Sequence, residues 1–268
     1  MKLKLYRKFV ELSNHPLTSS ILRNFTSSTF SRYVNRSFVK TYKIDENEME
    51  KSIDSYQSLQ ELFSRKLREG SRPIDEDPSS IVSPVDGVLT HTEEIDEHEA
   101  FTVKGQTYDL STLLGSEELA ERYIGGTVLL FYLSPQDYHR IHSPVTGEMV
   151  KRWALGSRSA PVNPFGLKHA DQPLSKNYRL MTELEMQGGK RVNIAKVGAM
   201  NVNSIQVLHK EKTLHKGEEF AFFSFGSSVL LLFEKGTFQN ECSHIQEGGK
   251  KVRQGERIGS FINGISET

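Results

Sequence analysis

Short apolar runs separated by turn-forming residues dominate the chain from about residue 71 onward. The runs 87–91, 127–133, 192–197 and 228–233 are rich in Val, Leu, Ile and Phe, and Gly, Pro, Asn and Asp lie between them. Such runs, bounded by turn signals, are typical of β-strands. Only short helices, such as one around residues 117–123, are expected to interrupt them. The pattern therefore predicts a β-rich fold for most of the chain.

The N-terminal part has a helical period instead. Phe30, Val34 and Phe38 recur every four residues, and basic residues at positions 32, 36 and 40 follow in the same rhythm. At ~100° per residue the two rows fall on opposite faces of a helix. Such a helix suits an anionic lipid surface. The same pattern suits equally well a helix that packs on the protein's own core and turns its basic face to solvent.

A second helix is predicted to start after Ser58. Ser58 and Glu61 form a capping box. Apolar side chains at positions 59, 62, 63 and 67 would form one stripe, and Gly70 would close the helix. Packing against the core is the expected task of this stripe.

Two pairs of similar segments indicate an internal duplication. Residues 83–87 (SPVDG) recur as 143–147 (SPVTG), and residues 216–220 (KGEEF) recur as 254–258 (QGERI). Duplicated hairpins of a β-sandwich or barrel would explain both pairs. The predicted fold class is therefore α+β, with a β-rich sandwich or barrel core built from duplicated hairpins and an N-terminal helical segment.

Charge and cysteine content restrict the class of protein. The 268 residues carry no formal net charge, which argues against a nucleic acid partner, yet residues 1–43 hold nine Lys or Arg against one acid. The single cysteine, Cys242, and the lack of a secretory signal favour a reducing compartment. The longest apolar runs are far shorter than the ~20 residues of a membrane-spanning helix. Any membrane contact is therefore expected at the surface.

Candidate catalytic side chains lie in and next to the repeated segments 83–87 and 143–147. Asp86 stands where the second copy has Thr146, and His139 and His142 directly precede that copy. An Asp in a turn commonly bonds nearby backbone, so Asp86 gains interest only together with the histidines. The two imidazoles could bind zinc with Asp137, but a catalytic zinc site needs further ligands. Proton transfer is the favoured interpretation, and no metal is expected.

The segment Gly226, Ser227, Ser228 precedes the most apolar run. A nucleophile elbow would need a second glycine that is absent here. A Gly–Ser bond instead allows the hydroxyl to attack the preceding carbonyl, which gives an ester if a base removes the proton. Elimination of that ester leaves dehydroalanine, and loss of ammonia to water gives a pyruvoyl group. A small-residue turn before a core strand is the plainer alternative.

An ordered set of short blocks from residue 58 to the end resembles the phosphatidylserine decarboxylase family. Residues 225–228 (FGSS) resemble its self-cleavage motif, in which Ser228 stands where Thr is usual. The other similar blocks are 63–67 (FSRKL), 70–74 (GSRPI), 83–87 (SPVDG), 103–105 (VKG), 138–144 (YHRIHSP), 176–179 (KNYR), 197–202 (VGAMNV) and 216–218 (KGE).

The resemblance implies cleavage between Gly226 and Ser227, giving a β chain of residues 1–226 and an α chain of residues 227–268 whose Ser227 becomes a covalent pyruvoyl cofactor. It implies that Asp86 and His142 activate Ser227, in the manner of a catalytic triad, and that His139 serves decarboxylation. The pyruvoyl group would form a Schiff base with phosphatidylserine and release CO2 and phosphatidylethanolamine. No pyridoxal phosphate is then required.

The resemblance also bears on organisation and location. Residues 1–57 are expected to form an amphipathic, membrane-associating segment, and residues 58–268 the decarboxylase domain. The expected partners are phosphatidylserine, a membrane surface, and the protein's own α and β chains as a heterodimer that could pair into a homodimer. A peripheral position on the cytoplasmic side of the cell membrane follows. Arg179 or N-terminal basic residues could hold the lipid phosphate.

Three alternatives stay open. One is a hydrolase that uses an intact Ser227 with His142 and Asp86. Another is a noncatalytic β-rich binding module, which the repeated Gly-Glu turns would suit. The third is a decarboxylase that acts on another serine-headed lipid.

Overall fold

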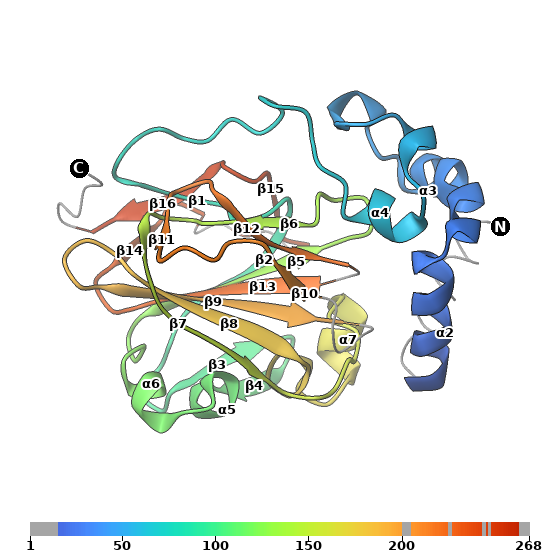
Figure 1. Ribbon diagram of the computed structural model, residues 1–268. Coiled ribbons are helices and arrows are strands. Elements are labelled where there is room, and N and C mark those ends of the chain that lie inside the picture. The colour runs from blue at the N-terminus through green and yellow to red at the C-terminus, as the bar shows by residue number, and fades with distance from the viewer. Residues whose placement is uncertain (1–15, 200–204, 225–226, 243–244, 246–247, 263–268) are drawn as a thin grey trace.

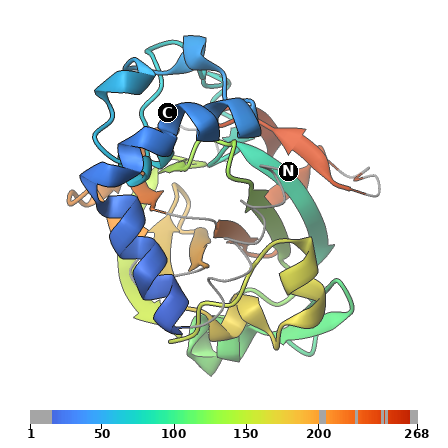
Figure 2. The same ribbon diagram turned by 90° about the vertical axis from the view of Figure 1, so that its right-hand side faces the viewer.

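The computed structural model describes residues 16–199, 205–224, 227–242, 245 and 248–262. One large antiparallel sheet lies at the centre of the molecule, and smaller sheets, a hairpin and short helices cover its two faces (Figure 1). The N-terminal helices pack at one end of this assembly (Figure 2). The predicted α+β class is confirmed, and its β-rich core is a sandwich whose sheets stay open.

The central sheet has eight strands, all antiparallel to their neighbours. Their order across the sheet is β11 (Thr213–Leu214), β7 (Gly147–Leu155), β8 (Arg179–Glu185), β9 (Arg191–Gly198), β13 (Ser227–Phe233), β5 (Thr127–Leu133), β2 (Gly87–Glu94) and β15 (Lys250–Val252). The four runs predicted as strands all lie within β2, β5, β9 and β13. Every residue of β13 is buried, because neighbouring strands and both covering layers enclose it.

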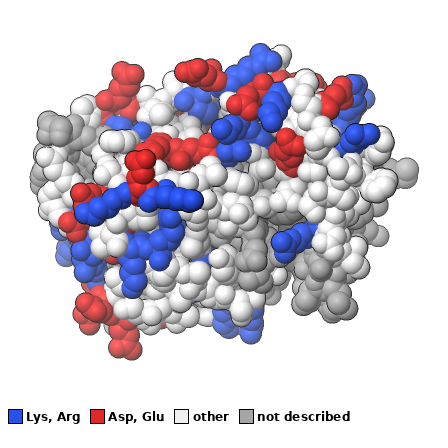
Figure 3. All heavy atoms as spheres, viewed as in Figure 1, with Lys and Arg blue, Asp and Glu red and all other residues white. Residues whose placement is uncertain are grey.

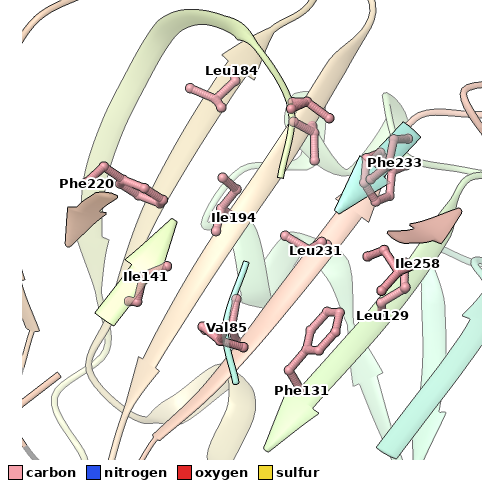
Figure 4. Packing of buried hydrophobic residues seen from close by; sticks show 14 of the residues in the cluster. Val85, Leu129, Phe131, Ile141, Leu184, Ile194, Phe220, Leu231, Phe233 and Ile258 are labelled. Carbon is pink, nitrogen blue, oxygen red and sulfur yellow. The ribbon is translucent and has the colours of Figure 1, made fainter. Parts of the chain in front are cut away.

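Two small sheets cover one face. They contain β1 (Ser80–Val82), β16 (Arg257–Phe261) and β14 (Phe238–Asn240), and β10 (Ile205–Val207), β12 (Glu219–Phe223) and β6 (Arg140–His142). The main hydrophobic cluster lies between these sheets and the central one, where Ile141, Phe220 and Ile258 meet Phe131 and Leu231 (Figure 4). Burial of each such side chain contributes ~1.5–3 kcal/mol. This cluster holds the sandwich together.

The opposite face carries a hairpin and four short helices. These are β3 (Ala100–Val103), β4 (Gln106–Asp109), α5 (Leu110–Leu114), α6 (Glu117–Glu121), α7 (Pro164–His169) and α8 (Pro173–Lys176). The helix expected around residues 117–123 is α6, whose N-cap Ser116 accepts a hydrogen bond from the backbone N–H of Leu119. A second hydrophobic cluster, which includes Leu230 and Leu232 of β13, fills this layer.

The predicted duplication is visible in the backbone. Residues 83–87 follow β1 and residues 143–147 follow β6, and the two copies exchange hydrogen bonds: Val82 N–H donates to Pro144 O at 3.1 Å, and His142 N–H donates to Pro84 O at 2.9 Å. Each copy also pairs with one Gly-Glu turn, since Gly255 N–H donates to the first copy and Gly217 N–H to the second. The two copies are thus related by an approximate twofold arrangement.

The N-terminal part consists of α2 (Pro16–Ser27), η1 (Thr29–Val34), α3 (Asn35–Tyr42), η2 (Glu46–Glu48), η3 (Ile53–Ser55) and α4 (Leu59–Phe63). The expected continuous helix through residues 30–40 is wrong, because a 3₁₀ segment and α3 divide it. Phe30 is 75% exposed whereas Phe38 is 6% exposed, so the apolar row does not share one face. Phe38 therefore packs on the protein's own core, as the second interpretation expects, and Phe30 lies in solvent.

The helix after Ser58 begins as predicted and ends too early. Ser58 caps the N–H of Glu61, but the Glu61 carboxylate accepts from the N–H of Gln57 instead of Ser58. The helix stops at Phe63, and Leu67 forms a β-bridge with Met49. Gly70 therefore closes no helix. The cluster around Phe38, Met49 and Leu62 includes residues from both sides of position 57.

Candidate active site

Ser227 begins β13, in which all seven residues are buried. It pairs with Leu133, the last residue of β5, and with Gly198, the last residue of β9. Its side chain is fully buried, and its Oγ has no hydrogen-bond partner among the described residues. Gly226 lies outside the described residues. A buried hydroxyl without a partner is unfavourable, so this position suits a residue that reacts and fits the precursor of a pyruvoyl group.

Ser228 points to the other face of the sheet. Its Oγ donates to the carbonyl of Val162, just before α7, at 3.4 Å. The alternation of side chains along β13 explains this difference, since Ser227 shares its face with Val229 and Leu231. Ser in place of the usual Thr at position 228 therefore keeps the hydroxyl and lacks only a methyl group, on the face opposite Ser227.

His139 lies beside the segment that leads to Ser227. Its carbonyl accepts from the N–H of Phe223 at 2.9 Å, and its ring packs on Phe63 with centroids 4.0 Å apart. Nδ1 lies 2.9 Å from the carbonyl of Asp137, which can only accept, so Nδ1 carries the proton. Nε2 is then a buried lone pair without a partner among the described residues. Burial lowers the pKa of His139 to about 3.

His142 lies in β6, where it pairs with Glu219, farther from Phe223 along β12 than His139. Its Nδ1 donates to the carbonyl of Gly217 at 2.8 Å, and its Nε2 accepts from the hydroxyl of Tyr138 at 3.2 Å. Burial lowers its pKa. Both histidines are therefore neutral near neutral pH, and they have different neighbours.

Asp86 lies in the first copy of the duplicated motif and is 6% exposed. Its Oδ1 accepts from the backbone N–H of Gln254 at 2.9 Å, and both of its oxygens accept from Arg72. The described hydrogen bonds of Asp86 and His142 do not join the two side chains. Burial has the largest effect on the pKa of His142 and lowers it, while the hydrogen bond to Gly217 and then the charges of Glu219 and Asp86 act to raise it.

Arg72, Tyr138 and Gly217 are site residues to which the sequence assigned no role. All three lie within family-like blocks. The contacts of Arg72 with Asp86 and of Gly217 with His142 span 14 and 75 positions and leave no local signal, whereas Tyr138 lies only four positions from His142. The suggestion that Arg179 holds a lipid phosphate is wrong. Arg179 is 2% exposed, and its guanidinium donates four hydrogen bonds, to the carbonyls of Thr112, Leu113, Ser175 and Asn177, so it faces the protein interior and not a ligand.

Acidic and basic side chains are interspersed on the face shown in Figure 3. Within the described part of the chain, no group of three or more His, Cys, Asp or Glu side chains has the arrangement of a metal site. The helices described are also too short or too polar to cross a membrane.

Comparison with known proteins gives a consistent result. The family model for phosphatidylserine decarboxylase matches residues 59–260. A phosphatidylserine decarboxylase proenzyme of Halalkalibacterium halodurans is 51% identical over 262 residues, covering 98% of this chain and 100% of the relative. Proenzymes with the same description from a Geobacillus species and from Bacillus thuringiensis are each 48% identical, and the matches cover 95% and 98% of this chain and 97% and 99% of those relatives.

Proposed function

The chain belongs to the phosphatidylserine decarboxylase family, and we propose that it is a self-cleaving enzyme that converts phosphatidylserine to phosphatidylethanolamine and CO2. The observation that carries the proposal is the similarity to proenzymes over nearly the whole chain, combined with a buried, unpartnered Ser227 hydroxyl among the described residues at the matching position.

Self-cleavage follows from the hydroxyl of Ser227. Its Oγ bonds to the carbonyl carbon of Gly226 while the C–N bond of that peptide breaks, and a base takes the hydroxyl proton and passes it to the freed amine. Loss of the Cα proton of residue 227 then breaks its Cβ–O bond, which leaves a carboxylate on Gly226 and dehydroalanine at position 227. Water then releases ammonia and leaves the pyruvoyl group at residue 227. We assign the base to His142, and we assign the stabilisation of its protonated form to Asp86.

The pyruvoyl group supplies an electron sink for decarboxylation. His139 is assigned the proton transfer at the substrate carbon, because its Nε2 lone pair is buried and faces no partner among the described residues. The low pKa keeps this nitrogen unprotonated, so Nε2 would first take a proton from the ammonium group of the substrate and then donate it to the carbon that loses CO2.

Mass spectrometry of the denatured protein tests the function. We expect two chains, residues 1–226 and 227–268, the second with a blocked terminus, and CO2 release from phosphatidylserine. Ser227→Ala should give one inactive chain, and so should His142→Ala and Asp86→Ala. His139→Ala should be cleaved yet decarboxylate poorly.

Each competing function has its own outcome. A single active chain with intact Ser227 would indicate a hydrolase, and absence of CO2 release would indicate a binding module. Faster CO2 release from another serine-headed lipid would change the substrate. Sedimentation of the cleaved protein measures whether the two chains form one heterodimer or a homodimer of such units.

We also propose that residues 1–57 rest on the cytoplasmic surface of the cell membrane, next to the decarboxylase domain of residues 58–268. Ile21 of α2, Phe30 and Tyr33 of η1, and Phe165 of α7 are each about 70% exposed (69–75%). α2 and α7 lie on the same side of the molecule (Figures 1 and 2). Large apolar side chains left in solvent are typical of a lipid-facing surface.

Pelleting with vesicles tests this surface. Phe30→Ser with Tyr33→Ser should weaken binding to anionic vesicles without unfolding the protein, because both side chains are exposed. Val150→Ser is a matched control, since Val150 is 45% exposed on β7. Unchanged pelleting of the double variant would refute the membrane contact.

A further inference from the structure

The two copies of the duplicated motif cap the same backbone position with different side chains. Thr146 Oγ1 accepts from the N–H of Lys216 at 2.9 Å, and Asp86 Oδ1 accepts from the N–H of Gln254 at 2.9 Å. A hydroxyl is therefore sufficient for this structural task. The carboxylate of Asp86 has a second oxygen and a charge that capping does not require.

Arg72 binds the carboxylate of Asp86 from the other side. Its Nε donates to Oδ1 at 2.9 Å and its Nη2 to Oδ2 at 2.6 Å, while Nη2 also donates to Glu48 Oε2 at 2.8 Å. Nη1 donates to the carbonyl of Ser71 at 2.7 Å. The side chains of Arg72 and Asp86 are each only 9% exposed. A planar guanidinium held at all three nitrogens fixes the orientation of a carboxylate.

Glu48 holds Arg72 from the N-terminal part of the chain. It lies in η2, and its own pKa is lowered by the hydrogen bond from Arg72. The backbone nearby is also tied down, because Arg68 N–H donates to the carbonyl of Glu48 at 2.9 Å. The orientation of Asp86 thus depends on a chain of contacts that begins before residue 50.

We infer that Arg72, held by Glu48, is a positioning residue for self-cleavage, which fixes the Asp86 carboxylate in the orientation from which it stabilises protonated His142. The inference rests on the proposed function, since it requires self-cleavage and a role for Asp86 in it. Arg72 acts only through Asp86, so it should not affect decarboxylation once the chain is cleaved.

The rate at which residues 227–268 appear on gels, measured on newly synthesised chain, tests this role. Arg72→Met should slow cleavage roughly 10- to 100-fold, the scale expected when a reacting group loses its orientation. Glu48→Gln should slow it less. The matched control is Arg257→Met, because Arg257 also bridges two carboxylates, Asp77 and Glu241, at the surface. It should cleave like the wild type.

Chemical rescue separates positioning from a structural role. Arg72 lines two hollows, one of about 170 Å³ beside Glu48 and Asp86 and one of about 490 Å³ beside Ile74 and Gln254. Guanidinium ion can therefore reach the space left by Arg72→Ala, and nondenaturing concentrations should restore cleavage at least severalfold. The Arg257→Met protein should not respond.

The outcomes are distinct. Wild-type cleavage by Arg72→Met, or slow cleavage that guanidinium does not relieve, would overturn the inference while the proposed function stands. A wild-type chain that is never cleaved would overturn the proposed function itself. CO2 release per cleaved molecule should equal that of the wild type, and a loss there would show that Arg72 acts on the substrate.

Discussion

The two copies of the duplicated motif share one backbone design and differ in chemistry. β1 with residues 83–87 matches β6 with residues 143–147, so Val82 corresponds to His142 and Thr146 corresponds to Asp86. Each copy therefore contributes one of the two residues assigned to the activation of Ser227. At the matching positions, Val82 donates its N–H to Pro144 O and Thr146 accepts from the N–H of Lys216. The proposed site thus draws one residue from each copy of a nearly symmetric frame.

Conversion of the first copy to the second should have the largest effect. Asp86→Thr keeps a group that can cap Gln254 but removes the charge, so we expect a folded protein whose cleavage is slower by roughly 10²- to 10⁴-fold, the scale of losing the acid of a triad. Gels and an unfolding midpoint measure both properties. Thr146→Asp is the reciprocal control and should cleave normally. Normal cleavage by Asp86→Thr would mean that the copies do not differ in function.

The two Gly-Glu turns should tolerate a side chain unequally. Gly217 and Gly255 both have φ near +80°, so alanine is strained at either position. A Cβ on Gly255 would lie 2.6 Å from the backbone carbonyl of Pro73, whereas one on Gly217 would meet the flexible end of Ile74. We expect Gly255→Ala to cost about 2–4 kcal/mol of unfolding free energy and Gly217→Ala about 1–2 kcal/mol. Denaturant titration in the uncleaved Ser227→Ala background compares them, and equal losses would contradict this difference.

The histidine next to the second copy should make stability depend on pH. The pKa of His139 is about 3 in the folded protein and 6.5 by reference, so between these values the unfolded chain binds more protons. The contribution of His139 to the free energy of unfolding is complete above pH 6.5 and is lost as the pH falls toward 3. Between pH 6.5 and pH 5 the loss of unfolding free energy is about 2 kcal/mol, at ~1.4 kcal/mol per pH unit. Denaturation of Ser227→Ala at both values should show the loss, and His139→Gln should reduce it. The same slope in both proteins would exclude His139 as its source.

The cap in the second copy should have the smallest effect. Thr146→Val removes the acceptor of the Lys216 N–H and should cost about 1 kcal/mol of unfolding free energy without slowing cleavage. Thermal unfolding of the Ser227→Ala protein with and without this change measures the cost. Slower cleavage by Thr146→Val would show that Thr146 itself takes part in the chemistry.

Much of the β-rich core could be predicted because local pattern and tertiary position agree there. The run 127–133 is apolar, and β5 spans the same residues between β13 and β2. The repeated blocks likewise revealed the duplicated frame before any contact was known. Strands and repeats of this kind can be recognised from consecutive residues alone.

The N-terminal part was less predictable because long-range contacts override its helical period. α4 stops at Phe63, after which Arg65 donates to the carbonyls of Gln136 and Asp137, more than seventy residues away. The contact of His142 with Gly217 spans 75 positions, and that of Asp86 with Arg72 spans 14. Residue types and family-like blocks singled out the groups that we assign to the chemistry, whereas only the fold shows which side chains and carbonyls contact them.

The place of β13 has a bearing on the lifetime of the mature molecule. Residues 227–268 supply an interior strand of the large sheet, its outermost strand β15, and two strands of a smaller sheet. Cleavage before residue 227 would leave the strands of the shorter chain hydrogen-bonded between strands of the longer chain. The new N-terminus would lie where β13 pairs with the last residues of β5 and β9. Dissociation would then demand global denaturation, so the severed fragments should melt together in one cooperative transition.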